Sequence, residues 1–142
     1  MGRKPLAPEA SSDIRYHFVF CARRRYCASG DPICARMEEI LAREARRIGC
    51  VLAGVSFGKD CVALEVVGRP DIAPADIAEA LKWRTETEMR AEFRELRAIP
   101  SLWTEGYLVT TGTPDEGMLG RFVAGERKDD SAARVILTAP PG

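Results

Sequence analysis

Few side chains in this sequence of 142 residues are suited to acid–base, nucleophilic or metal chemistry. His17 is the only histidine, so a metal site or catalytic triad that needs two imidazoles cannot be built from this chain. The five cysteines form neither a CxxC pair nor a zinc-ribbon spacing, and we interpret them as small buried hydrophobic residues. They are Cys21, Cys27, Cys34, Cys50 and Cys61.

Basic and aromatic residues that suit nucleic acid follow the first strongly apolar segment and recur in a later helix. Guanidinium and ammonium groups pair with phosphates, and a tyrosine ring stacks on a base. An ordinary solvated charge cluster is the alternative interpretation. The candidates for DNA contact are Arg23, Arg24, Arg25, Tyr26, Lys82 and Arg84.

The composition limits the classes of function. Lys and Arg total 21, and Asp and Glu also total 21, so a site for a polyanion must be local rather than a uniformly basic surface. The apolar runs are far shorter than the roughly 20 residues needed to cross a bilayer, and residues 1–13 have no apolar signal-peptide core. We therefore expect a cytoplasmic protein with no membrane segment.

Hydrophobic patterning predicts the element order β-α-β-β-α-β-α. Residues 15–22 are rich in aromatic and β-branched residues, which is typical of a strand covered on both faces. Asp31 and Pro32 form a helix start, and Gly49 forms a helix end. The remaining expected elements are a hairpin of strands 51–57 and 61–67, a helix from Pro74 that stops before Pro100, a strand over 103–111 and a short helix over 113–127.

This order predicts an α+β fold of the ferredoxin-like or RRM-like class. Its antiparallel sheet would carry helices packed on one face, with one appended C-terminal helix. We expect one domain over residues 14–127, preceded by a flexible tail over 1–13 and followed by another over 128–142.

The most specific motif is residues 101–110, with the sequence SLWTEGYLVT. It is preceded by a strand with the sequence YHFVFC at residues 16–21, which basic residues follow, and by a helical stretch over 72–84 that includes KWR at residues 82–84. Together these segments resemble the HUH-type single-tyrosine transposases of bacterial insertion sequences, the insertion-sequence 200-like group and its REP-associated relatives. The resemblance covers roughly residues 14–127.

The catalytic motifs of this family are replaced in the present sequence. By resemblance, catalysis needs a His-hydrophobic-His strand that holds a divalent metal, a tyrosine on the last helix that attacks the scissile phosphate, and a glutamine one turn later. The matching positions are Cys61 and Ala63, Phe122, and Glu126. Alanine has no lone pair for a metal, and phenylalanine has no oxygen for a phosphotyrosine bond. The resemblance therefore implies a retained fold with a lost active site.

A substitute metal site is the alternative to a lost site. Cys61 and Glu65 share one face of a strand because side chains alternate with period two, and Glu126 is a third donor of the right type. A buried cysteine and two solvated or salt-bridged glutamates are the more ordinary interpretation.

The remaining side chains with possible chemistry are His17 and the tyrosines. His17 lies between two aromatic residues, which favours a structural hydrogen-bonding role. A substitute nucleophile would have to be Tyr16, Tyr26 or Tyr107, none of which lies on the last helix. Tyr107 lies within the strand motif, which favours packing.

We expect a transposase-like protein that binds hairpin or single-stranded DNA without cleaving or transposing it, and that needs no cofactor. The resemblance implies a homodimer, and an unidentified protein partner is compatible with it. One alternative is an active transposase or nuclease with substituted ligands, which would use a divalent metal such as Mg²⁺. The other is a protein-interaction module derived from a transposase, which the zero net charge favours.

Overall fold

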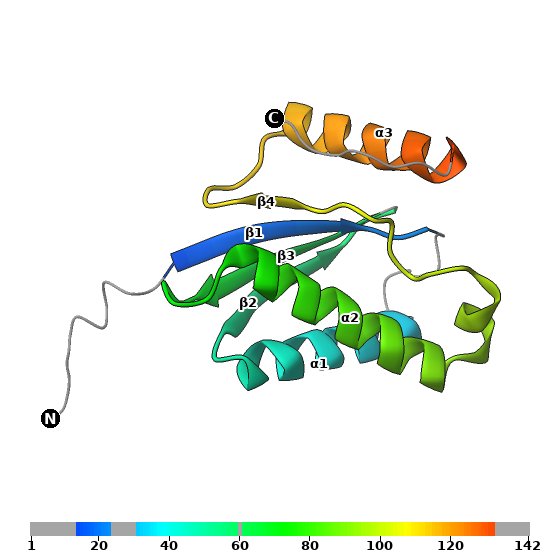
Figure 1. Ribbon diagram of the computed structural model, residues 1–142, viewed down its shortest axis with the longest axis horizontal. Coiled ribbons are helices and arrows are strands. Elements are labelled where there is room, and N and C mark those ends of the chain that lie inside the picture. Colours follow the sequence, from blue (N-terminus) through cyan, green and yellow to red (C-terminus); the bar gives the residue numbers. More distant parts are fainter. Residues whose placement is uncertain (1–13, 24–30, 60, 133–142) are drawn as a thin grey trace, which may run out of the picture.

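A computed structural model describes residues 14–23, 31–59 and 61–132, with side chains as far as residue 127. It contains one antiparallel sheet with the strand order β2-β3-β1-β4. Helices α1 and α2 lie on one side of this sheet, and α3 lies beside β4 on the other side (Figure 1). This arrangement confirms the predicted ferredoxin-like α+β class with an appended helix. The elements are β1 (Ile14–Cys21), α1 (Pro32–Arg47), β2 (Val51–Phe57), β3 (Cys61–Gly68), α2 (Pro74–Glu92), η2 (Arg94–Ala98), β4 (Leu108–Thr110) and α3 (Glu116–Ala132).

Strand β1 is buried on both faces, as its apolar sequence predicts. Phe18 and Phe20 point toward α1 and α2 and belong to the main hydrophobic core. Val19 and Cys21 alternate with them and are also buried, although they face the opposite side of the sheet. The position of β1 between β3 and β4 therefore covers residues 18–21 on both faces, whereas Arg15 near its start is exposed.

Helix α1 begins and ends at the residues that the sequence predicts. The side chain of Asp31 accepts a hydrogen bond from the backbone N–H of Ile33 at 2.8 Å, and Pro32 occupies the first turn. After the helix, Gly49 adopts a φ of 85°, a left-handed conformation that glycine reaches without strain. These local signals fix the length of the helix that covers the core.

Strand β4 is much shorter than the predicted strand over residues 103–111. Only Leu108–Thr110 pair as a strand, and Trp103 makes an isolated bridge to Ala22. The physical reason lies in the segment between them, because the ammonium group of Lys82 binds the backbone carbonyls of residues 104, 105 and 106. Carbonyl groups turned toward one cation cannot alternate along a sheet ladder.

The ends of the last two helices also differ from the prediction. Helix α2 ends at Glu92, and the Arg90 guanidinium donates to the carbonyls of Leu96 and Ile99 in the η2 turn, at 3.2 Å and 2.7 Å. Helix α3 begins after Asp115, whose side chain accepts from the N–H of Met118, and continues to residue 132. Helix α3 thus extends five residues beyond its predicted end at residue 127, and the predicted tail over residues 1–13 lies outside the described residues.

Candidate functional site

The positions that the resemblance assigns to the metal-binding histidines lie on the sheet face turned away from α1 and α2. Val62 and Leu64 of β3 point into the main core, so Cys61 and Ala63 between and beside them point to the opposite face. Ala63 is exposed and lies opposite Val19, whereas Cys61 is half-buried. A methyl group at residue 63 offers no electron pair to a metal.

Glu126, at the position of the metal-assisting glutamine, is buried and engaged by the protein itself. Its Oε1 atom accepts a hydrogen bond from the Gly106 N–H at 2.9 Å and another from the Thr104 hydroxyl. Both donors belong to the segment between Trp103 and β4. The carboxylate therefore attaches α3 to this segment.

Two further features describe how α3 lies against the sheet. Arg127 donates through its guanidinium to the backbone carbonyls of Ala22 and Arg23, at the end of β1. Phe122, at the position of the nucleophilic tyrosine, lies one turn before Glu126 and is partly buried. At the position of the nucleophile, α3 therefore carries the Phe122 ring, which has no oxygen. Glu126 and Arg127, which attach the helix to the rest of the protein, follow about one turn later.

The residues do not fit the divalent metal that the family resemblance implies. Glu65 forms an ion pair with Arg15 at 2.7 Å, and it lies four residues from Cys61, about 13 Å along an extended strand. In the described part of the chain, no group of three or more His, Cys, Asp or Glu side chains could hold an ion. With Glu126 already engaged by two donors, we derive no chemistry through a metal.

The other residues with possible chemistry have packing or pairing roles. His17 is half-buried and lies opposite Glu65 on β3 and Thr110 on β4. The Tyr107 ring packs against Phe18 with a centroid separation of 6.3 Å, and burial raises the pKa of the Tyr107 hydroxyl. Such a hydroxyl is a poor nucleophile at neutral pH.

Only part of the candidate DNA surface falls within the described residues. Arg23 follows β1, where its Nε donates to the Ser101 hydroxyl at 2.6 Å and its N–H donates to the Leu102 carbonyl. The candidates Arg24, Arg25 and Tyr26 lie outside the described residues, as does Cys27. The basic run 23–25 therefore begins at the end of β1, next to residues 101 and 102.

Lys82 and Arg84, the candidates on α2, have partners within the protein. The Lys82 ammonium donates to the carbonyls of residues 104–106 at 2.9 Å, 3.1 Å and 3.1 Å, and its burial lowers the pKa of the group. Arg84 lies 3.3 Å from Glu44 and 3.8 Å from Glu88, and its guanidinium is 5.0 Å from the Trp83 ring centre. The structure does not present the two groups together toward a single strand of DNA.

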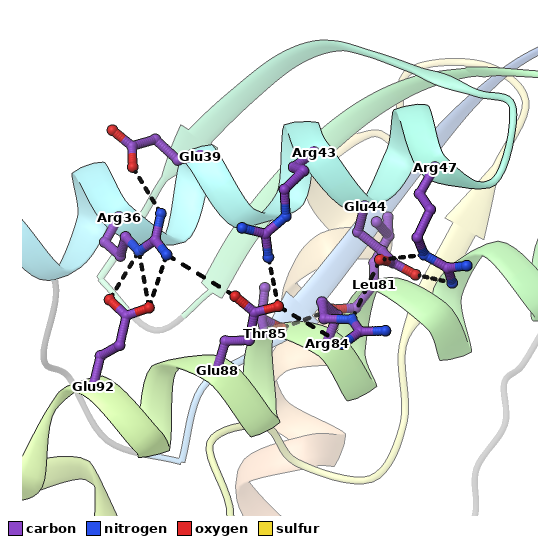
Figure 2. A network of polar contacts seen from close by, with 10 residues as sticks. All are labelled: Arg36, Glu39, Arg43, Glu44, Arg47, Leu81, Arg84, Thr85, Glu88 and Glu92. Carbon is purple, nitrogen blue, oxygen red and sulfur yellow. Dashed lines mark hydrogen bonds and ion pairs between the residues drawn. The ribbon is translucent and has the colours of Figure 1, made fainter.

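Figure 2 shows that the arginines between α1 and α2 alternate with glutamates. Buried Glu44 binds both Arg47, at 2.6 Å, and Arg84. Further ion pairs between arginine and glutamate follow along α1 and α2, so positive and negative charges balance on this surface. They join Arg36 to Glu39, Glu88 and Glu92, and Arg43 to Glu88.

Sequence comparison supplies the family. Residues 10–124 match the family model described as "Transposase IS200 like". The chain belongs to this family. Among curated proteins, none matches the chain significantly. Within the described residues of this family member, no helix is both long enough and apolar enough to cross a membrane.

Structural comparison gives the same fold. A crystal structure assigned to a transposase from Deinococcus radiodurans R1 is similar, with a TM-score of 0.70 and 22% sequence identity. The similarity covers 89% of the present chain and 96% of that one. A structure of A. aeolicus tRNASec in complex with M. kandleri SerRS aligns more weakly, with a TM-score of 0.47 and 14% identity over 90% of this chain and 34% of that one.

Sequence reasoning did not find the residues that hold Glu126. The residue types of Thr104 and Gly106 were visible within the 101–110 motif, but nothing in the sequence pairs them with a helix that begins ten residues later. The one available signal was the glycine itself, because glycine in a strand often marks a close approach by another group.

Proposed function

We propose that this chain is a DNA-binding member of the IS200-like transposase family that neither cleaves nor transposes DNA. The observation that carries the proposal is the state of Glu126, whose buried carboxylate accepts hydrogen bonds from the Thr104 hydroxyl and the Gly106 N–H. Ala63 and Phe122, which lack donor atoms, support the same conclusion. The protein then acts by occupying DNA rather than by breaking a phosphodiester bond.

The charge distribution supports a DNA surface at the end of β1. On the α1–α2 surface, arginines and glutamates neutralise one another, so that surface offers phosphates little net attraction. The run of three arginines at residues 23–25 has no acidic residue within it and continues into Tyr26. Three adjacent guanidinium groups and a ring suit the backbone and an unpaired base of hairpin or single-stranded DNA.

The test measures binding and cleavage together. Fluorescence anisotropy of labelled hairpin and single-stranded DNA is recorded at low and moderate salt, with the wild type and with the double variant Arg24→Ala/Arg25→Ala. This variant leaves the Arg23 contact with Ser101 in place. The matched control is Arg94→Ala/Arg97→Ala, which removes two exposed arginines from η2.

We expect wild-type binding to weaken steeply with salt, because each phosphate contact releases a counterion. The Arg24→Ala/Arg25→Ala variant should bind about tenfold or more weakly with a shallower salt dependence, and the η2 control should bind like the wild type. A parallel reaction with Mg²⁺ or Mn²⁺ should leave the DNA intact. A cleaved product that disappears with Glu65→Ala would establish the active alternative, and absence of salt-sensitive binding would favour the protein-interaction module.

The proposed functional unit is a homodimer, as the family resemblance implies. Trp83 is 59% exposed on α2, and large exposed aromatic residues are common at protein interfaces. Sedimentation equilibrium of the wild type and of Trp83→Ala tests this directly. A wild-type mass of a single chain at micromolar concentration would contradict the dimer, and an unchanged dimer in Trp83→Ala would place the interface elsewhere.

A further inference from the structure

Cys21 and Cys61 lie directly opposite each other in the pairing of β1 with β3. Their backbone groups point away from one another, because the Cys21 carbonyl accepts from the Thr104 N–H at 2.9 Å and the Cys61 carbonyl accepts from the Gly58 N–H at 2.7 Å. The two residues therefore form a non-hydrogen-bonded pair, in which Cα atoms are about 4.5 Å apart. Disulfides span Cα separations from about 4.4 Å.

The two cysteines differ in access to solvent. Cys21 is fully buried near Arg127 of α3, whereas Cys61 is half-buried at the start of β3 beside a turn. Both are thiols in the structure and both point to the sheet face opposite α1 and α2. An oxidant in solution therefore reaches the sulfur of Cys61 first, with the sulfur of Cys21 already beside it.

We propose that Cys21 and Cys61 form an oxidation site that closes a cross-strand disulfide when the protein meets a hydroperoxide. The Cys61 thiolate attacks one peroxide oxygen, the O–O bond breaks, and one water leaves after protonation while Cys61 becomes a sulfenic acid. The Cys21 sulfur then attacks the Cys61 sulfur, the S–O bond breaks, and the second water leaves. Two thiols lose two electrons and two protons, and hydrogen peroxide gains both.

The protonation of the Cys21 thiol controls the rate at which its sulfur attacks the sulfenic acid at Cys61. Burial above all, together with the adjacent Cys61 and with Glu126 of α3, raises the pKa of the Cys21 thiol to about 12, while Arg127 opposes this shift. Because the thiolate is the attacking species, the disulfide should close faster as the pH rises from 7 to 9.

Peptide mapping tests the proposal on the intact chain. The protein is treated with hydrogen peroxide, alkylated to block remaining thiols and digested with trypsin. Residues 16–23 and residues 60–82 then form separate peptides that each contain one of these cysteines. We expect a linked pair whose mass is two hydrogens below the sum of the two unmodified peptides, in a protein that migrates as a single chain without reductant.

Matched variants distinguish this disulfide from general oxidation. Cys50→Ala, which removes a buried cysteine elsewhere in the core, should keep the linked pair. Cys21→Ala should abolish it and drive Cys61 to sulfinic acid, because no thiol is left to displace the sulfenic oxygen. Sulfinic acid at Cys61 in the wild type, or a link between other cysteines, would overturn the proposal.

The disulfide also has a thermal signature. It would close a chain loop between residues 21 and 61, which restricts the unfolded ensemble. We expect peroxide to raise the melting temperature of the wild type by about 5–10 °C, and reductant to reverse the shift. Cys61→Ala, whose substitution is at a half-buried position, should show no such rise.

Discussion

Gly106 and Glu126 interlock, because a side chain at residue 106 would occupy the space that the carboxylate fills. The Gly106 N–H donates to Glu126 Oε1 at 2.9 Å, and a Cβ atom built at residue 106 would lie 2.7 Å from Oε2. Real Cβ atoms do not approach so closely, so a substitution must displace the carboxylate. The glycine of the 101–110 motif is thus required by a residue on a different element.

This contact predicts that Gly106→Ala destabilises the protein by about 1–3 kcal/mol, the usual cost of overpacking a fitted contact. Urea unfolding measures the change. Gly120→Ala is the control, because Gly120 lies on α3 with open space around it. Alanine there should stabilise the helix by about 0.5–1 kcal/mol. Equal effects of the two substitutions would contradict the interlocked contact.

Removing the carboxylate should also cost stability. Glu126→Ala leaves the Thr104 hydroxyl and the Gly106 N–H without their acceptor, which we expect to cost about 1–3 kcal/mol. Glu126→Gln retains an acceptor oxygen and should cost less. In the Glu126→Ala background, Gly106→Ala should become nearly neutral, since the displaced group is gone.

The same variants separate a docking role from a metal-binding role. Thermal melts of the wild type and Glu126→Ala are recorded with and without Mn²⁺. If Glu126 only attaches α3, the ion leaves both melting temperatures unchanged. A metal-dependent stabilisation of the wild type that Glu126→Ala removes would instead identify the carboxylate as a ligand.

Local signals in the sequence predicted most of the fold, and long-range polar contacts account for the rest. Asp31, Pro32 and Gly49 are residue types that prefer the conformations found at helix ends, so the bounds of α1 could be predicted from the sequence. The length of β4 could not, because Lys82, on a helix, binds the carbonyls that precede β4 and lie 22 to 24 residues later in the chain. Hydrophobic alternation contains no information about such a contact.

For the candidate site, too, the sequence predicts the chemistry of single side chains but not the contacts between distant residues. The sequence identified Ala63 and Phe122 as residues without donor atoms, which is a property of the side chains alone. The sequence left Glu126 as a solvated or salt-bridged carboxylate or a metal ligand, whereas the structure buries it against Thr104 and Gly106. Which atoms meet Glu126 depends on the docking of α3, and that is set by tertiary packing.

Glu44 provides a prediction with a defined pH dependence. The Arg47 hydrogen bond, opposed by burial and aided by the charges of Arg47 and Arg84, lowers the pKa of the Glu44 carboxyl below its ordinary value of 4.5. A carboxyl whose pKa is lower in the folded state stabilises the protein above the ordinary value, and this contribution is lost as the pH falls through the folded value.

Glu44→Gln should therefore destabilise the protein by about 1–3 kcal/mol at pH 7, where it removes the charge that accepts two hydrogen bonds from Arg47 and forms an ion pair with Arg84. The difference from the wild type should shrink as the pH falls below 4.5. Glu39→Gln is the control on the same helix, because its side chain is 67% exposed and pairs only at the surface. Its effect should stay below about 0.5 kcal/mol at either pH.

Lys82 distinguishes a structural cation from a DNA-binding one. Lys82→Met keeps the length and apolar stem of the side chain but leaves the carbonyls of residues 104–106 without their shared donor, which we expect to cost about 2–4 kcal/mol. The Lys82 ammonium binds carbonyl groups of the protein itself and is not expected to contact a phosphate. At a temperature where the variant is folded, the slope of log binding constant against log salt concentration should therefore equal that of the wild type. Exposed Lys59→Met serves as the control for stability and should change it by less than about 0.5 kcal/mol. A slope reduced by about one unit in Lys82→Met would instead show that Lys82 neutralises a phosphate.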